Sequence, residues 1–534
     1  MPINIRERSQ KVASCLKTKA SATLQTIAAT TGLHPSSVHR HRHGINRRNQ
    51  YPESSFWETE AGYQWLLRLV FGVVYHFGIK QGVGAESLSE FIQAMHLDTH
   101  VASSASSLRQ LKHRVNQALL DYEASQSEHC QPSAGQGICV GADETFFGLP
   151  VLVLLELASG YIFIETECEN RTYETWMEQV NQGWSSHHWH CHYLVSDGAR
   201  ALVKLAVSGL GCVSVADLFH ALRALGRPFG PVLGRQAVSL KKQQDKLQKQ
   251  LDKHREQPLS TALQSSLEGI VADQQQGQKD EQTYHDAIEH ISQIIHPFTL
   301  DSQQWQTQRN LLTHLASPLQ VLWDLAQAYN TQKAQKAIDT FEKQIDSFAQ
   351  GIDAWRDWVT LALEAQTQDA ALRSWVLRFL LPWVYWTQQA DKTRQPALKQ
   401  RYQQAASTAF DRLFEQPETL TLDNIQHQRW ICWCREFCAK YQRTSSAVEG
   451  RNGYLSKLHH ARRGFSEQSL QVLTIIHNFD LKRPDGSTAA QRLFGHNFPD
   501  VFEWMLEQVG DLPMPRMSAK AHSPKPLYAD GFSA

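Results

Sequence analysis

The stretch VGADETFFGLPVLVLLELASGYIFIETE, residues 140–167, decides the fold prediction. Its apolar runs, VLVLLEL and YIFIETE, flank the turn-like LASG and predict a hairpin of two strands. A further strand, ICVGAD, precedes them and ends on Asp143, with Glu144 next in the chain. Acids are depleted in strands and costly to bury unpaired, so this pair lies either in a solvated turn or beside something positive. Because neighbouring strand residues point to opposite faces, only one of the two can face the next strand, and Asp143 is the better candidate.

Two more predicted strands follow the hairpin, and each ends on an acid. HYLVSD ends on Asp197 and CVSVAD ends on Asp217, and a helix-like segment precedes and follows each strand. The order strand-strand-strand-helix-strand-helix-strand-helix predicts an α/β domain with a mixed five-stranded sheet and helices on its faces. Strands one and four are expected to be neighbours, which brings Asp143 and Asp197 together at the strand ends, where ligands gather in such sheets.

A third acid is available much later in the chain. Carboxylates brought side by side repel unless a cation separates them, and Mg²⁺ prefers carboxylate oxygens and water. Two such ions can clamp the attacking and leaving oxygens of a phosphodiester. In TSSAVEGRNGYLSKLHHARRGFSEQSLQVLTIIHNF, residues 444–479, Glu449 lies at the start of a predicted helix. The same segment carries a polar and basic row that suits a DNA backbone: Arg451, Asn452, Lys457, Arg462 and Arg463.

The first 50 residues are basic, with nine Lys or Arg residues against Glu7 alone. Within them, ATLQTIAATTGLHPSSVHRHRHG, residues 22–44, has helical apolar spacing, a turn at Gly32 and a second helix start at Pro35. This is the helix-turn-helix pattern, whose second helix enters a DNA major groove; an ordinary helical hairpin is the alternative. The residues expected to contact DNA are His39, Arg40, Arg42, Arg47 and Arg48.

Changes of composition divide the rest of the chain. Residues 51–125 are expected to be helical, as a second DNA-binding unit or a connector. Strand patterns stop after residue 235, and residues 236–440, rich first in Gln and Lys and then in Trp, predict an all-α block that begins with a helical hairpin. The sheet domain is therefore expected in two parts, residues 137–235 and 441–510, followed by a flexible tail, residues 511–534.

The overall composition predicts an intracellular protein. The 53 basic and 53 acidic residues cancel, which argues against a uniformly basic nucleic-acid coat. Nine cysteines, an odd number without a framework pattern, suit a reducing cytosol. The most apolar early stretch, WLLRLVFGVVYHFGI, is shorter than the roughly 20 residues of a membrane span and predicts a buried helix. We expect no membrane partner and a cytoplasmic, nucleoid-associated protein.

Two other clusters of potential metal ligands carry weaker signals. SSHHWHCHY, residues 185–193, leads into a strand and lacks the ligand spacing of a zinc site. RWICWCREFCAKY, residues 429–441, holds three cysteines, of which only Cys434 and Cys438 share a helix face. Both clusters are interpreted as structural, as are the Trp residues of the all-α block, although one of these could stack on an unpaired base.

Four segments, GADETFF, LVSDGARAL, VADLFHAL and SSAVEGRNGYLSKLHHARRGF, together resemble the DDE-type transposases of bacterial insertion sequences. The resemblance implies an RNase H-like catalytic core interrupted by a large helical insertion, which the long separation of Asp197 from Glu449 accommodates. It covers roughly residues 137–230 and 444–480, and a helix-turn-helix precedes the core in many such enzymes. VADLFHAL matches the D-x-x-H element of the group with the insertion, through Asp217 and His220.

By this resemblance, Asp143, Asp197 and Glu449 form the catalytic, metal-binding triad. It would hold two Mg²⁺ ions, for which Mn²⁺ can substitute. Asp217 and His220 would be a supporting pair; Asp217, which also ends a strand, is a rival second acid on distance alone. His220 could bond a phosphate, brace the sheet or be a packed core histidine.

The implied activity is Mg²⁺-dependent cleavage of DNA strands at the element ends and transfer of the ends to target DNA. The implied partners are double-stranded DNA, as terminal inverted repeats and target, and a second copy of the chain, with the Gln/Lys-rich hairpin as a candidate interface. The sequence departs from the pattern at Leu218, where Arg is frequent, and in its neutral net charge. The alternative from another class is a catalytically inactive, transposase-derived DNA-binding regulator.

Overall fold

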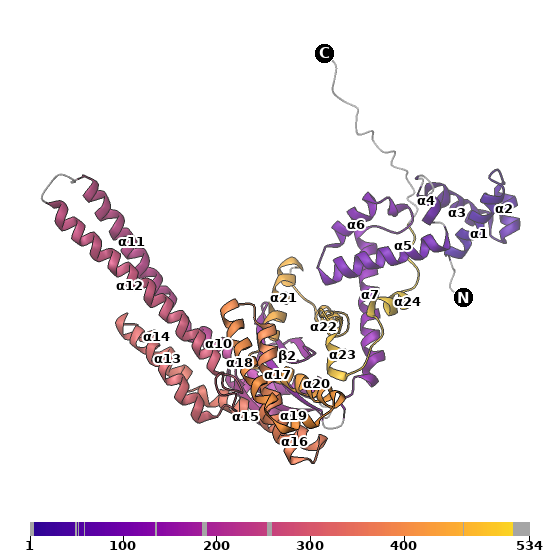
Figure 1. Cartoon of the computed structure of the whole chain (residues 1–534). Helices are drawn as coiled ribbons and strands as arrows, with labels where there is room; N and C mark the ends of the chain where they lie inside the picture. The colour runs from indigo at the N-terminus through magenta and orange to yellow at the C-terminus, as the bar shows by residue number, and fades with distance from the viewer. Residues whose placement is uncertain are drawn as a thin grey trace. The chain divides into compact units, whose positions relative to one another are not determined.

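The computed structural model describes residues 5–48, 51, 53–57, 59–133, 136–183, 189–253, 259–462 and 464–515, and Figure 1 shows its backbone. The chain divides into two compact units. The first comprises residues 1–128, 457–482 and 497–534, and the second comprises residues 129–456 and 483–496. Residues 457–482 and 497–510, which the sequence pattern groups with the sheet domain, are thus part of the first unit. Of the predicted tail, residues 516–534 lie outside the described residues.

Three short helices begin the first unit: α1 (Ile5–Thr18), α2 (Leu24–Thr31) and α3 (Pro35–Arg48). Thr23 caps α2 by accepting a hydrogen bond from the amide of Thr26. The helix ends at Gly32, whose φ of 68° is in the left-handed region that favours glycine. Ile27 and Val38 are buried in the core between the helices. Two helices joined by a tight turn therefore lie where the sequence predicts them.

The rest of the first unit is helical. Tyr75 and Lys80 both bond to the carboxylate of Asp480, at 2.8 and 2.6 Å, and so join two segments of the unit that are distant in sequence. The predicted apolar helix is buried on one face only, since Leu66 and Val70 are buried whereas Trp65 and Phe77 are exposed. The elements are α4 (Ser54–Trp57), α5 (Glu60–Gly72), η1 (Val73–Lys80), α6 (Ala85–Ala94), η2 (Leu97–Thr99), α7 (Ala105–Gln126), η3 (Ser127–His129, whose last residue opens the second unit), α22 (Glu467–Phe479) and α24 (Val501–Gln508).

A five-stranded mixed sheet forms the core of the second unit, as the strand order predicts. The strands are β1 (Gly137–Phe146), β2 (Pro150–Glu156), β3 (Ile162–Glu167), β4 (His190–Ser196) and β5 (Val213–Ala216). Their order in the sheet is β3-β2-β1-β4-β5. β2 pairs antiparallel with β1 and β3, whereas β4 pairs parallel with β1 and β5. Strands one and four are thus neighbours, as expected.

The two faces of β1 pack on different helices. Val140 and Ala142 lie in one apolar cluster with Trp176 of α8 (Tyr173–Gly183) and Leu202 of α9 (Arg200–Lys204), which continues as η4 (Leu205–Gly209). Gly141 faces the other way, because a side chain there would meet Val448 of α21 (Ser446–Arg462). Helix α15 (Ile345–Gln366) contacts β4 and β5. The alternation of the strand thereby assigns each residue of β1 to one of two environments.

The predicted all-α block is present between β5 and α21. In the described ranges it is helical apart from short connections and one isolated β-bridge, Phe298 to Trp305. Its first two long helices form the predicted antiparallel hairpin, which extends away from the sheet as an arm (Figure 1). The helices are α10 (Leu218–Gly226), α11 (Phe229–Lys253), α12 (Leu259–Ile294), α13 (Gln308–Ala328), α14 (Gln332–Glu342), α16 (Ala370–Trp375), η5 (Val376–Leu380), α17 (Leu381–Lys392), α18 (Pro396–Phe414), α19 (Pro417–Thr421) and α20 (Asn424–Lys440); α23 (Ala489–Phe494) completes the unit.

Candidate active site

Asp143 lies inside β1 and not at its end, which corrects the sequence prediction. β1 continues to Phe146 because its antiparallel pairing with β2 continues to the pair Phe146 and Pro150. Its parallel pairing with β4, however, stops at Gly141. Asp197 directly follows the last residue of β4 and is exposed. The two acids therefore share the edge where β1 and β4 separate, and the expected placement at one end of the sheet holds.

Glu144 points to the opposite face of β1 from Asp143, as strand alternation predicts. Its side chain is 3% exposed, and one carboxylate oxygen lies 3.5 Å from the guanidinium of Arg171. Burial raises the pKa of Glu144, Arg171 opposes that rise, and the carboxylates of Asp197 and Asp143 add to it. Trp176, which belongs to the cluster on that face of the sheet, also lies close enough to lower the pKa. Glu144 is thus a neighbour of the site on the opposite face of β1.

The third acid reaches the same edge from α21. Burial raises the pKa of Asp143, and the carboxylates of Asp197 and Glu449 raise it further, whereas the amide of Glu144 and the ring of His220 lower it. Asp197, Glu449 and His220 thus all lie close enough to Asp143 to affect its pKa. The Nε2 atom of His220 lies 3.1 Å from Oε1 of Glu449. The contact has ion-pair distance without hydrogen-bond geometry, since Nε2 has no hydrogen-bond partner.

Asn452 also contacts the site. Its Nδ2 atom donates a hydrogen bond of 3.0 Å to Oδ2 of Asp143. Asn452 follows Glu449 by three residues, so both lie on one face of α21. The sequence assigned Asn452 to DNA, and the structure places its amide on a candidate catalytic carboxylate. The spacing E-x-x-N at a helix start was the signal that could have indicated a shared face.

Asp217 has a structural place that the sequence did not reveal. It is 2% exposed and caps α10, where Oδ1 accepts a hydrogen bond of 3.0 Å from the amide of His220. Its other oxygen accepts from the amide and from the hydroxyl of Ser445. Both oxygens are thus occupied, which argues against Asp217 as the rival second acid. The same contacts fasten the residue before α21 to the end of β5.

Arg451 is buried and paired within the protein. Its side chain is 3% exposed, and its guanidinium binds the fully buried carboxylate of Glu165 in β3 through two hydrogen bonds, of 2.7 and 2.5 Å. This geometry differs from the prediction that Arg451 holds phosphate. An arginine whose fork is taken by a buried carboxylate is not free for DNA. Its pairing instead holds the first turns of α21 against the far strand of the sheet.

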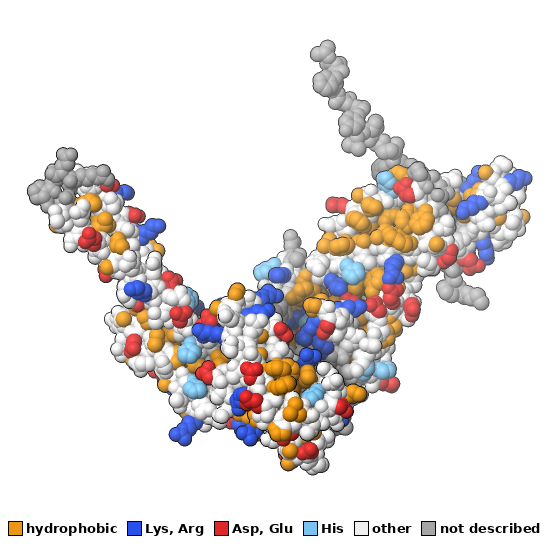
Figure 2. Space-filling view, in the orientation of Figure 1, with side chains coloured by type: hydrophobic (Ala, Val, Ile, Leu, Met, Phe, Trp, Pro, Cys, Tyr) orange, Lys and Arg blue, Asp and Glu red, His pale blue; other side chains and the backbone are white. Residues whose placement is uncertain are grey.

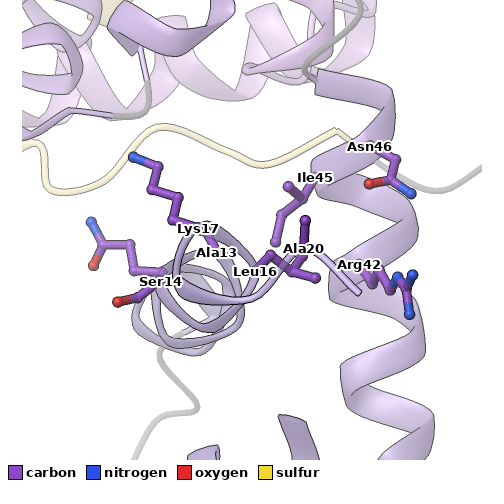
Figure 3. Close-up of a pocket in the computed structure, with 9 residues that line it drawn as sticks. Ala13, Ser14, Leu16, Lys17, Ala20, Arg42, Ile45 and Asn46 are labelled. Atoms are coloured by element: carbon purple, nitrogen blue, oxygen red, sulfur yellow. The ribbon is translucent and has the colours of Figure 1, made fainter. Parts of the chain in front are cut away.

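The other predicted DNA contacts that the structure describes lie on α3 and α21. His39 and Arg40 are exposed on α3. Arg42 is partly buried and donates a hydrogen bond of 3.3 Å to the carbonyl of Ala22. With Ile45, Asn46 and residues of α1, it lines a pocket of about 400 Å³ (Figure 3). Lys457 is exposed on α21. Arg47, Arg48 and Arg462 are the last residues of α3 and α21, with side chains outside the described part, and Arg463 lies outside the described residues.

The side chains are not arranged as a preformed metal site. Among the described residues, no group of three or more His, Cys, Asp or Glu side chains is placed to hold a metal ion. At the candidate site, Asn452 and His220 contact two of the three acids. The histidine cluster falls partly outside the described residues, and His192 stacks on Trp358 with ring centroids 4.2 Å apart. Cys434 is buried and Cys432 is exposed, so the cysteine segment is a helix with one thiol-bearing inner face.

The comparison with known proteins concerns the later part of the chain. No curated protein matches it. Residues 376–521 match a family of unknown function (DUF6399). The matched segment includes α17, α18, α20 and α21, and with α21 the candidate acid Glu449 and its neighbours Arg451 and Asn452. It includes none of the five strands, and so neither Asp143 nor Asp197. The similarity to that family thus covers the end of the helical insertion and α21, the helix that carries Glu449.

Proposed function

We propose that this protein is a DDE-type transposase with an RNase H-like core, which cleaves DNA strands at the ends of its own element and joins them to target DNA. One observation carries the proposal. At the edge where β1 and β4 separate, in a sheet ordered β3-β2-β1-β4-β5, Asp197 after β4 and Glu449 on α21 both lie close enough to Asp143 on β1 to raise its pKa. Glu449 reaches that edge only after the long helical insertion, as the resemblance implies.

The donor set suits Mg²⁺ in its chemistry. All three acids offer carboxylate oxygens, the ligands that Mg²⁺ prefers. The raised pKa of Asp143 reflects a buried negative charge near two further carboxylates, which a divalent cation would compensate. Asp143, Asp197 and Glu449 would hold the ions, and the hydrogen bond from Asn452 and the contact with His220 would have to be shared or released. Two bound ions would supply an activated nucleophile and stabilise charge on the attacking and leaving oxygens.

The chain's own residues would position these acids. Asp217 fixes the start of α10 and the start of α21 by accepting hydrogen bonds from both. His220 lies within ion-pair distance of Glu449, where its ring also offers a donor for a phosphate oxygen. The Asn452 amide orients the Asp143 carboxylate. Because the acids would hold cations and not attack the DNA themselves, the reaction would require no covalent bond between the protein and DNA.

Recognition of the element ends is assigned to α2, its turn and α3. His39 and Arg40 are exposed on α3, the helix that would enter the major groove as the second helix of a helix-turn-helix. Joining two ends requires two catalytic sites, so the active form on DNA is at least a dimer.

Asp197→Ala provides the test. Asp197 is exposed at a strand end, so its loss should leave folding intact. DNA that flanks the reading frame supplies the candidate ends. We expect wild type to nick these ends in Mg²⁺, and Asp197→Ala to bind them equally but to be slowed by about 10²–10⁴-fold, since metal stabilisation contributes several kcal/mol. If neither protein cuts while both bind, the protein is instead a DNA-binding regulator without catalysis.

A further inference from the structure

A row of cations runs along the first helix of the arm. Residues 218–253, which form α10 and α11, contain eight Lys or Arg residues and two acids, in a chain whose net charge is zero. All eight cations are exposed. They are Arg223, Arg227, Arg235, Lys241, Lys242, Lys246, Lys249 and Lys253. Figure 2 shows Lys and Arg side chains at intervals along the arm.

The outer cations point away from the other helix of the arm. The seam of the hairpin includes Leu240, Gln244 and Leu247, and Gln244 accepts a hydrogen bond of 3.0 Å from Gln274 of α12. Lys242 and Lys249 each follow a seam residue by two positions, which is about 200° around a helix. Lys246 and Lys253 continue the same stripe at spacings of three and four residues. The stripe is therefore on the back of α11, and α12 does not cover it.

The partners of the charges differ between the two helices. α12 carries six acids and one lysine, and three of the acids accept hydrogen bonds within the unit. Asp280 binds Gln276 and Tyr329, Asp286 binds Gln282, and Glu289 binds Gln293 and Gln395. In contrast, none of the eight cations of α10 and α11 forms an ion pair within the described part of the chain. Among the described residues, the cations of the stripe thus have no ion-pair partner and are available to an external anion.

The row of eight cations begins beside the candidate active site, on α10. Asp217 caps α10, and His220 in its first turn lies 3.1 Å from Glu449. Arg223 follows His220 by three residues, and α11 carries the row outward from there. From Arg235 to Lys253 the helix rises about 27 Å, which corresponds to roughly eight base pairs of B-DNA. A duplex engaged at the acids and leaving along α10 would meet these cations in succession.

We propose that the exposed face of α10 and α11 is a binding track for the phosphate backbone of duplex DNA, which guides the DNA to and from the candidate active site. This inference rests on the proposed function, and it adds a contact surface separate from α3 and from the acids. Lysines spaced along a helix neutralise phosphates without selecting a base, so the track would be independent of sequence. It would contribute to affinity and to placement of the flanking or target DNA.

The test is the salt dependence of binding to a random-sequence 40-base-pair duplex, followed by fluorescence anisotropy with the full-length chain. The variant Lys242→Gln/Lys246→Gln/Lys249→Gln removes three cations of the stripe, and glutamine keeps helix propensity close to that of lysine. The matched control, Lys333→Gln/Lys336→Gln/Lys343→Gln, removes three exposed lysines on or beside α14. The net charge changes equally in both, so only the position of the charges differs.

We expect the arm variant to reduce the slope of log K against log salt by about 2.7, since each phosphate contact contributes about 0.9. The control should keep the slope of wild type. A wild-type slope in the arm variant would overturn the track. If the arm variant keeps the wild-type slope but is a monomer in solution where wild type is a dimer, the track is also overturned. The stripe would then bind a second copy of the chain.

Failure of the proposed function gives a different result. If wild type binds the duplex with the steep slope and the arm variant loses it, but no Mg²⁺-dependent cleavage occurs, the catalytic proposal fails and the binding track stands. If cleavage occurs and the arm variant keeps the full slope, the catalytic proposal stands and the track fails.

Discussion

Asp217 and Ser445 are joined by two hydrogen bonds, one from the amide and one from the hydroxyl of Ser445 to the same carboxylate oxygen. Both residues are buried, and 228 positions of the chain separate them. Next to this pair, the amide of Leu218 donates a hydrogen bond of 3.0 Å to the carbonyl of Arg443. The residues that flank the helical insertion are thus fixed directly to each other, four residues before Glu449.

Asp217→Asn should separate positioning from DNA binding. The change replaces one acceptor oxygen by an NH₂ group, which faces two donors of Ser445, and we expect a loss of about 1–3 kcal/mol in the free energy of unfolding. Cleavage should fall by about 10-fold or more because Glu449 is less well placed, while affinity for DNA stays that of wild type. Denaturant unfolding and anisotropy measure the two quantities. An unchanged cleavage rate in a folded variant would contradict the positioning role.

Asp143→Asn should stabilise the protein at neutral pH in buffer without Mg²⁺. The pKa of Asp143 is raised in the folded state, so the folded protein binds this proton more tightly than the unfolded chain does. At a pH above the ordinary Asp range, the ionised carboxylate therefore lowers the free energy of unfolding. The cost grows as the pH rises through the folded-state pKa and is absent below about pH 3, where both states are protonated. The asparagine retains an acceptor for Asn452. Thermal unfolding at pH 7 and pH 3 should show the gain at pH 7 only.

Mg²⁺ gives this pair of proteins a second readout. Any ligand that binds only the folded state raises its stability by mass action. We expect millimolar Mg²⁺ to raise the melting temperature of wild type and to have little effect on Asp143→Asn. Equal shifts in both proteins would place the bound ion elsewhere, independently of any measurement of cleavage.

Arg451→Ala should unfold more easily without a specific loss of DNA contacts. It removes the charge and the two hydrogen bonds that Arg451 supplies to the buried carboxylate of Glu165, which we expect to cost about 3–5 kcal/mol in the free energy of unfolding. The double variant Arg451→Met/Glu165→Leu should recover most of that loss, because no charge remains buried. If Arg451→Ala keeps the stability of wild type but lowers the salt slope of DNA binding by about 0.9, the residue contacts phosphate after all.

Gly141→Ala tests how closely α21 approaches β1. An added Cβ would lie 2.7 Å from Cδ2 of Leu157 and 3.0 Å from Cγ2 of Val448, so we expect a loss of about 1–3 kcal/mol and a shift of the helix that carries Glu449. Adding Val448→Ala should restore part of the stability. The control is Gly450→Ala on the same helix, where no atom lies within 4 Å, and helix propensity predicts a gain of about 0.5–1 kcal/mol. Equal effects of the two substitutions would exclude this close contact.

On α3, Arg40 and Arg42 should differ although they are two residues apart. Arg40 is exposed, and Arg40→Ala should weaken binding to the element ends and reduce the salt slope by about 1 at constant stability. Arg42 donates to Ala22, and Arg42→Ala should lower the free energy of unfolding by about 1 kcal/mol. If both variants bind the element ends as tightly as wild type, α3 is not the recognition helix.

Local patterns predicted much of the fold. The alternation of apolar residues in β1 to β3 indicated the meander, and the same alternation correctly placed Asp143 and Glu144 on opposite faces. The end of β1 was predicted at Asp143, but antiparallel pairing with β2 extends the strand to Phe146. The local sequence pattern around Asp143 did not indicate this pairing. The Gln- and Lys-rich periodicity likewise predicted the α11 and α12 hairpin.

The partners of charged side chains could not be predicted in the same way. Arg451 meets Glu165 across 286 positions, and only the packing of α21 on the sheet determines that pair. From the sequence, a basic residue on a polar helix was therefore predicted to bind phosphate, although its partner is a carboxylate of the same chain. Asp217 was closer to prediction, because an acid three residues before His220 at the start of a helix is a typical N-cap.

The helical insertion also sets the order in which the site can be assembled during synthesis. Asp197 leaves the ribosome 252 residues before Glu449, and Asp143 earlier still, which at about 5–20 residues per second is a delay of at least roughly 10–50 seconds. The segment that meets Asp217, at Ser445, is made only after the whole insertion. A nascent or prematurely terminated chain thus has two of the three candidate acids and lacks the third. A cut in DNA would then depend on a finished chain, and incomplete products would be harmless to the genome that encodes them.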